Sequence, residues 1–212
     1  MTKMEIITKC NLDCDEMIHQ GDILTNVEYI EYADIIDGNI EISKIMFPKV
    51  IVLTQECDSV QDYANRKDCY QKIDTGDDIK TNQFILSTIV APLYSLDDIV
   101  AGTHLSNINI IKDGKITDST LKYEHINSEK KKLLKQNKDD RYHYLKIDIN
   151  GNYVEYVIDF KHYFTVNTDR LIKHKESNFF VSIESVFKEA VNQRFSNFLS
   201  RIGLPESSIE EK

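Results

Sequence analysis

The 212-residue sequence contains no tryptophan and few prolines and glycines, three and seven respectively. The glycines form neither GxGxxG nor GxxxxGK[ST], which excludes the usual nucleotide-binding loops. The sequence also lacks HExxH, GxSxG and an EF-hand loop. No apolar run approaches the roughly 18–20 residues of a membrane helix, and residues 1–16 lack the apolar core of a secretory signal. We therefore expect a cytoplasmic protein that does not contact a membrane.

Cysteine is also scarce, with four residues at positions 10, 14, 57 and 69. In a cytoplasmic chain these thiols are expected to stay reduced, so a disulfide framework is not predicted. The spacing of Cys10 and Cys14 fits no standard zinc pair, and the glycines of a zinc knuckle are absent. A four-thiolate zinc site is the less favoured alternative. We predict no metal and no cofactor.

Positive charge is in deficit, with 26 Lys and Arg against 35 Asp and Glu and a net charge of −9. Because cations dominate phosphate binding, this balance argues against a surface that embraces nucleic acid as a whole. One segment, residues 129–141, differs from the average, and its basic residues are Lys130, Lys131, Lys132, Lys135, Lys138 and Arg141. A solvated helix face or loop is the favoured interpretation. The alternative is an arm that contacts phosphates.

The composition, 41% hydrophobic and 29% charged, is typical of a globular protein, and we expect one domain over residues 1–212. Residues 21–47 mix β-branched and aromatic residues around a turn at Asp37-Gly38-Asn39. The short apolar run 49–53 predicts a strand covered on both faces, and 83–93 predicts another that ends at Pro92. The polar segment between these two strands is expected to be a helix or loop.

The second half adds hairpins and a final helix. Turns are predicted at Asp113-Gly114 and at Asn150-Gly151, the strongest two-residue hairpin signal in the chain. Helical spacing of apolar residues predicts an amphipathic helix over about 182–202, capped by Ser182. The prediction is an α+β fold: a β-barrel over about 20–175, with an inserted helical segment and an extra hairpin, and the C-terminal helix packed against it.

Three fragments in order, QGDIL (20–24), FPKVIVLTQ (47–55) and FILSTIVAPLYS (84–95), resemble the MazF/PemK-like toxins, which are small SH3-like barrels. The resemblance covers roughly residues 20–100. In that family an arginine precedes the strand proline, and a threonine or serine ends the later strand. Phe47 holds the arginine position here and Ser95 matches the other. Phenylalanine cannot supply the permanent, bidentate charge that arginine offers a phosphate.

The resemblance implies a protein of a bacterial conflict system, either toxin–antitoxin or phage defence. It would act as an RNA-directed effector or as a module that binds a protein encoded nearby, and related barrels imply a homodimer. If RNA is bound, the candidate phosphate-facing residues are Ser95, Lys130, Lys131, Lys132 and Arg141.

A second hypothesis starts from the polar residues 54–58 that follow the buried strand. Cys57 is the strong nucleophile there, and a thiol needs a base to react near pH 7. His143 is the candidate base with Asp159 as its orienter, and His104 is the reserve. The alternative function is thus a cysteine-dependent hydrolase or transferase with Cys57, Asp58, His143 and Asp159 as catalytic residues. Structural roles are the competing interpretation: a semi-buried Cys57, Asp58 capping a helix, and Asp159 paired with Arg194 or Arg201.

Overall fold

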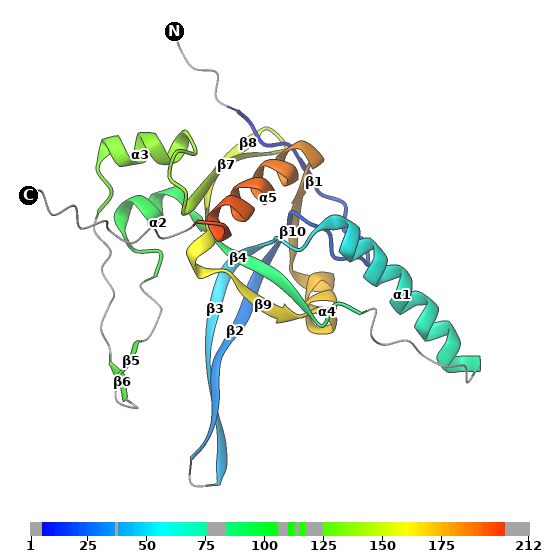
Figure 1. Cartoon of the computed structure of the whole chain (residues 1–212). Coiled ribbons are helices and arrows are strands. Elements are labelled where there is room, and N and C mark those ends of the chain that lie inside the picture. Colours follow the sequence, from blue (N-terminus) through cyan, green and yellow to red (C-terminus); the bar gives the residue numbers. More distant parts are fainter. Residues whose placement is uncertain are drawn as a thin grey trace, which may run out of the picture.

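The computed structural model describes residues 6–36, 38–75, 84–105, 110–112, 115–117 and 125–201. Within these ranges the chain is α+β, with one eight-stranded antiparallel sheet, a separate two-stranded hairpin and five α-helices (Figure 1). No helix in the described ranges is long and apolar enough to cross a membrane.

The strands of the large sheet are β1 (Cys10–Asn11), β2 (Asp22–Ile36), β3 (Asn39–Val52), β4 (Ser87–Ser95), β7 (Tyr142–Ile149), β8 (Asn152–Asp159), β9 (Phe164–Asn167) and β10 (Phe179–Ile183). The separate hairpin is β5 (Ile110–Lys112) with β6 (Lys115–Thr117). The helices are α1 (Glu56–Thr75), α2 (Leu96–Ala101), α3 (Ser128–Lys135), α4 (Thr168–Asn178) and α5 (Ser185–Leu199), with a 3-10 turn η2 (Phe160–His162). The predicted hairpins are confirmed as the pairs β2–β3, β5–β6 and β7–β8, and the helical segment between the two apolar strands is confirmed as α1. Asp37 and the predicted turn residues Asp113 and Gly114 lie outside the described residues.

The large sheet runs β1-β10-β2-β3-β4-β8-β7, and β9 pairs with the other end of β4. This path does not close on itself. Its two ends approach at Thr8, which forms one parallel bridge to Ile147 and exchanges backbone hydrogen bonds with Lys146 and Asp148. The predicted barrel is therefore confirmed only as an antiparallel sheet, and the SH3-like topology stays a prediction.

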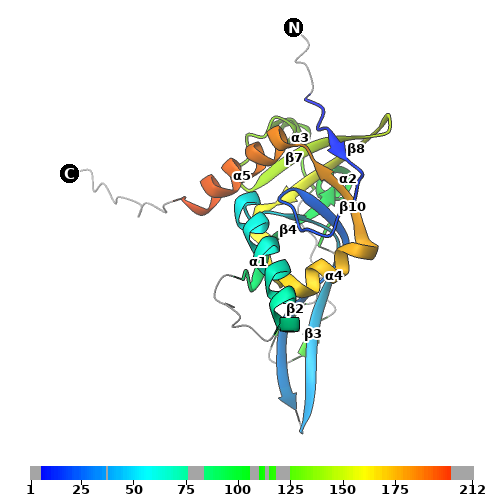
Figure 2. The ribbon, with the colours of Figure 1, turned by 90° about the vertical axis from the view of Figure 1, so that its right-hand side faces the viewer.

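The hairpin of β2 and β3 joins the predicted strands of residues 21–47 and the predicted strand 49–53 into one ladder. Its register extends from the Ile23–Ile51 pair to the Ile36–Asn39 pair, and Gly38 takes a left-handed φ of +80° in the turn. The predicted short strand 49–53 is the buried end of this ladder. The other end projects away from the body as a two-stranded arm (Figures 1 and 2).

Strand β4 runs through Pro92 to Ser95, so the prediction that Pro92 ends this strand was wrong. On one side β4 pairs with β9 over residues 87–90 and with β8 over residues 93–95. Pro92 lies between these two ladders. Because proline has no N–H to donate, a position where a strand changes partners accepts it without losing a ladder hydrogen bond.

Helix α5 confirms the predicted C-terminal helix, but it begins at Ser185 and not at Ser182. Ser182 belongs to β10, where it pairs with Asp22 of β2 and Asn11 of β1. The helix packs on the core through Val191 and Phe195, and the Phe195 ring lies 5.5 Å from that of Phe160. Aromatic pairs at this separation add to the stabilisation from burial.

Candidate functional site

The polar residues that follow β3, residues 54–58, have different structural roles. The Thr54 hydroxyl accepts a hydrogen bond of 2.8 Å from the Ile89 N–H and so joins the end of β3 to β4. Glu56 is the first residue of α1, and its side chain belongs to a charged cluster. Cys57 and Asp58 are exposed on the first turn of that helix. Asp58 lies inside α1, so its predicted role as the cap of a helix that starts near Ser59 was wrong.

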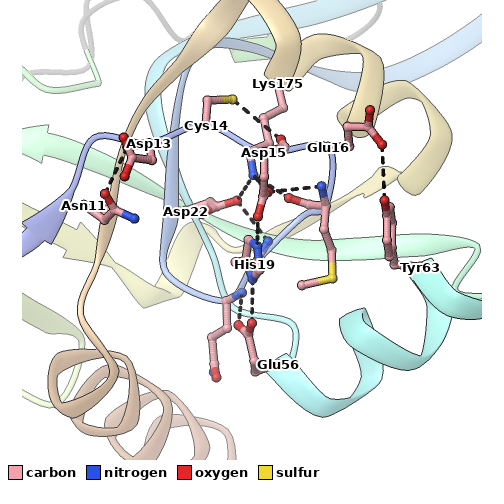
Figure 3. Close-up of polar contacts among 12 residues, drawn as sticks. Asn11, Asp13, Cys14, Asp15, Glu16, His19, Asp22, Glu56, Tyr63 and Lys175 are labelled. Atoms are coloured by element: carbon pink, nitrogen blue, oxygen red, sulfur yellow. Dashed lines mark hydrogen bonds and ion pairs between the residues drawn. The ribbon is translucent and has the colours of Figure 1, made fainter.

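The cluster around Glu56 is centred on His19, whose two ring nitrogens each contact a carboxylate (Figure 3). Nδ1 lies 2.6 Å from Glu56 Oε1, and Nε2 lies 2.7 Å from Asp15 Oδ2. Burial disfavours the charged ring, but the hydrogen bonds to Glu56 and Asp15 outweigh it and raise the pKa of His19. An imidazolium that donates both N–H groups to carboxylates has no lone pair to accept a proton, so this histidine does not serve as a general base.

Lys175 joins the same cluster from α4 and is only 2% exposed. Its Nζ lies 2.9 Å from Asp22 Oδ2 and 3.0 Å from Asp15 Oδ1, and it also donates to the Met17 carbonyl. Burial alone would lower the pKa of Lys175, but the carboxylates of Asp22 and Asp15 raise it. The ammonium therefore stays charged inside the protein.

A cavity of about 450 Å³ lies beside this cluster and is lined in part by Asp13, Asp15, Asp22 and Glu184. Among the described residues, no group of His, Cys, Asp and Glu side chains has the arrangement of a metal site. Two of these carboxylates are already paired, Asp15 with His19 and Lys175, and Asp22 with Lys175. The cluster connects residues 13–22 to α1 and α4, and we interpret its role as structural.

A second charged network surrounds Asp159 at the end of β8. The Asp159 side chain is completely buried. Arg141 binds it bidentately, with Nε 2.8 Å from Oδ1 and Nη2 2.6 Å from Oδ2. His162 Nδ1 lies 2.7 Å from Oδ2, and the Lys161 N–H donates to Oδ1 at 3.1 Å. Burial would raise the pKa of Asp159, but the bonds from Arg141 and His162 outweigh it and lower the pKa to about 2.

Next to this network is a cavity of about 350 Å³ between α2, α3 and the start of β7. Its lining residues are Ile99, His104, Ile126, Lys130, Leu134, Asp139, Arg141 and Tyr142. The Arg141 guanidinium lies over the Tyr142 ring, 4.8 Å from its centroid. Burial, the largest effect, lowers the pKa of His104 and favours its neutral form. The cavity thus combines cations, an aromatic ring and a neutral imidazole.

Two of the five residues predicted to bind RNA line this cavity, and the other three lie on the helices around it or at their ends. Lys130 and Arg141 line it, and Lys131 and Lys132 continue from Lys130 along α3. Ser95 caps α2, which forms one wall, by accepting a hydrogen bond of 3.1 Å from the Asp98 N–H. Its role is therefore to hold that helix.

The four residues predicted to be catalytic are not joined in one network. Within the described ranges, no contact links Cys57 to His143: the Cys57 sulfur lies 3.7 Å from both Gln55 Oε1 and Asp58 Oδ1. His143 is 5% exposed, and burial together with the charge of Arg194 lowers its pKa to about 3. It is therefore neutral, and its ring centroid lies 6.4 Å from that of Phe160 in the core.

The predicted pairing of Asp159 with Arg194 or Arg201 was wrong, because Asp159 binds Arg141. Arg194 reaches from α5 to the carbonyls of Asn137, Asp139 and Tyr142 at 2.6, 2.6 and 2.9 Å. It holds the turn that carries Arg141. Arg201 donates to the Phe198 carbonyl within its own segment.

The cluster of His19, Asp15 and Lys175 was not predicted from the sequence. The Asp15-x-x-x-His19 spacing was a signal, since residues four apart often meet on one side of a turn. Lys175 lies 160 residues from Asp15, and only the packing of α4 brings them together.

The chain matches no protein-family profile, no curated protein and no solved structure.

Proposed function

We propose that the protein is an RNA-directed effector of a bacterial conflict system and that it holds single-stranded RNA at the cavity beside Arg141. The observation that carries the proposal is the guanidinium of Arg141, fixed by buried Asp159 at the rim of a cavity that Lys130 also lines. A fixed guanidinium can contact a phosphate or stack on an unpaired base.

The shape and charge of this region support the same ligand. The cavity, at about 350 Å³, falls within the roughly 300–1,000 Å³ typical of small-molecule sites and can accept one nucleotide. Lys130 and Lys132 are exposed on α3 next to it and can follow the phosphates of a strand. These lysines form a locally basic surface that can attract phosphates although the whole chain has a net charge of −9.

Cleavage in this proposal is attack of a ribose 2′-hydroxyl oxygen on the adjacent phosphorus, which breaks the P–O5′ bond and leaves a 2′,3′-cyclic phosphate; water takes the 2′-hydroxyl proton and supplies one to the leaving 5′-oxygen. Both ring nitrogens of His104 are buried, so this imidazole does not take the proton. Arg141 and Lys130 would stabilise the negative charge that builds up on the phosphate. Phe47, at the family's arginine position, is buried and stacked on Phe164 at 5.0 Å, so the toxin family's own mechanism is not part of the proposal.

The test compares two triple variants that lose the same charge. One is Lys130→Ala/Lys131→Ala/Lys132→Ala on α3, and the control removes the exposed lysines Lys9, Lys67 and Lys173. Binding of labelled single-stranded RNA is measured by fluorescence anisotropy at several salt concentrations. We expect the α3 variant to bind at least about tenfold more weakly and the salt slope to fall by about 2, at roughly 0.7 per lost phosphate contact. Equal affinities of the two variants would refute the site.

Cleavage is tested separately on gels, with single-stranded RNA against single-stranded DNA of the same sequence. Since the proposed reaction uses the 2′-hydroxyl, DNA should stay intact. RNA that wild-type protein binds but leaves intact would remove the catalytic part of the proposal and keep the binding part.

The burial of Phe47 in the core favours a second form of the proposal, in which the fold is a partner-binding module without nuclease activity. Co-expression with the products of neighbouring genes, followed by size-exclusion chromatography, tests it. Failure of every neighbour to co-elute would count against this form.

A further inference from the structure

The projecting end of the β2–β3 hairpin, residues 28–46, has two faces of opposite character. Directly opposed residues of an antiparallel pair lie on the same face, and neighbours along a strand lie on opposite faces. The Ala33–Ile42 and Ile35–Ile40 pairs therefore share one face. The register shift after Ile30 places that residue, opposite Lys44, on this face too. The Glu28–Met46 pair continues the same face to the base of the arm.

We call this side the apolar face, and its large exposed side chains are Ile30, Ile35, Ile40, Ile42 and Met46, which are 46%, 72%, 72%, 56% and 52% exposed. The opposite side carries the Tyr32–Ser43 and Asp34–Glu41 pairs and is mainly polar. At the base, this polar side becomes the core-facing side, where Tyr29 packs on Phe164. The arm is thus apolar on the side that points away from the core.

An isolated two-stranded hairpin is at best marginally stable in water, so an arm of this length gains from being covered. Five side chains, each half to three-quarters exposed, present roughly 400 Å² at about 32 Å² per methylene. That is within the size of patches that commonly mark interaction sites, roughly 300–600 Å². The figures show the arm standing clear of the body (Figures 1 and 2).

We propose that the apolar face binds the apolar face of a second copy of this chain, with the two arms antiparallel. In a two-fold dimer the same patch meets itself, so like charges must not oppose each other across the contact. The two charged residues that the arm places on this face cancel, since Lys44 Nζ lies 2.6 Å from Glu28 Oε1. Arg170 of α4, which also binds Glu28, leaves one positive charge at the base of the arm, and in the antiparallel arrangement that base meets the partner's tip and not the partner's Arg170. The acidic residues Asp34 and Glu41 lie on the opposite face and point away from the contact.

The base of the arm supplies a place for the partner's tip. A cavity of about 240 Å³ opens there, and both apolar and polar side chains line it: Asn26, Val27, Glu28, Met46, Val166, Arg170, Leu171 and His174. From Ile40 to Met46 a strand spans roughly 20 Å at about 3.4 Å per residue. Two arms laid antiparallel over that length bring the tip isoleucines of one copy, Ile35 and Ile40, to the cavity of the other.

The size of this contact sets the expected strength. Two faces of roughly 400 Å² bury about 800 Å² in total, below the roughly 1,200 Å² of a standard stable interface. We therefore expect a weak dimer with a dissociation constant of roughly 1–100 μM. This inference is independent of the proposed binding of RNA.

Sedimentation velocity over about 1–200 μM protein measures the dimer directly. The test variant, Ile35→Thr/Ile40→Thr, removes apolar surface at the tip but keeps β-branched residues that favour strands. The control, Asp34→Thr/Glu41→Thr, changes the adjacent opposed pair on the other face. We expect the first variant to weaken the dimer at least about 100-fold and the control to leave it within about threefold.

The orientation is tested by mixing an Ile40→Cys chain with a Met46→Cys chain under mild oxidation. Antiparallel arms predict a cross-linked heterodimer, with wild-type protein reporting any background from the native cysteines. A monomer across the whole concentration range, or equal loss of dimer in both threonine variants, would overturn the proposal. Cross-linking of Ile40→Cys only to itself would overturn the antiparallel arrangement.

Discussion

The buried carboxylate of Asp159 allows a quantitative prediction of stability and its pH dependence. Replacing it by asparagine keeps the shape but removes the charge that Arg141 and His162 contact. The pKa of about 2 in the folded protein lies nearly two units below the usual value, and each unit corresponds to about 1.36 kcal/mol. Ionisation of this single group therefore contributes about 2.5 kcal/mol to the free energy of unfolding at neutral pH.

The direction of the pH effect follows from the lowered pKa. A carboxylate with a depressed pKa stabilises the fold above its unfolded pKa, near 3.8, and the contribution is lost as pH falls through about 2. The advantage of wild type over Asp159→Asn should thus be about 2–4 kcal/mol at neutral pH, with the upper end reflecting weaker bonds to Arg141. About half of the ionisation term should be gone by pH 3.

The assay is urea denaturation followed by circular dichroism at several pH values, with the slope m compared between variants. Asp140→Asn is the matched control, because it removes an exposed aspartate one residue before Arg141. We expect it to change the free energy of unfolding by less than about 0.5 kcal/mol. A loss below about 1 kcal/mol for Asp159→Asn, or a loss that does not change with pH, would refute the reasoning.

Three further predictions concern histidine and cysteine. His19 has a raised pKa, so its contribution is complete below about pH 6.5 and is lost as pH rises through the folded pKa; the advantage of wild type over His19→Gln should be larger at about pH 6 than at about pH 9. His143 has a pKa of about 3 and must bind a proton on unfolding in mild acid, so wild type should lose about 2 kcal/mol more than His143→Leu between about pH 6.5 and pH 4.5 in the same urea assay. Cys57 contacts only Gln55 and Asp58 among the described residues, so iodoacetamide below about pH 7 should label it no faster than exposed Cys14, and a faster reaction would revive the cysteine-dependent enzyme.

Local sequence signals were enough to predict an element whose conformation depends on one short segment. The turn at Asn150-Gly151 was predicted because both positions need a left-handed backbone, and their φ values are 53° and 85°. The helix over 185–199 was predicted from the spacing of its apolar residues. Pro92 does not end its strand, because a proline is compatible with a strand where the neighbouring ladder changes, and that change depends on β8 and β9.

For the candidate site, the sequence predicted some of the residues but not their partners. Lys130 and Arg141 were selected as cations in an acidic chain, and both line one cavity. That Arg141 is held by Asp159, and that Cys57 is not joined to His143, depends on how β8, α1 and α5 pack. Residue type shows what chemistry a side chain can do, whereas its partner is set by contacts between distant segments.

The sequence alone determined the α+β character, the main turns and the amphipathic C-terminal helix, because these follow from backbone preferences and apolar spacing within a few residues. Only the tertiary structure decided that the sheet stays open, that His19 is held between two carboxylates, and that the β2–β3 arm has an exposed apolar face. Each of these depends on strand register and on segments far apart in the chain, which local preference does not encode.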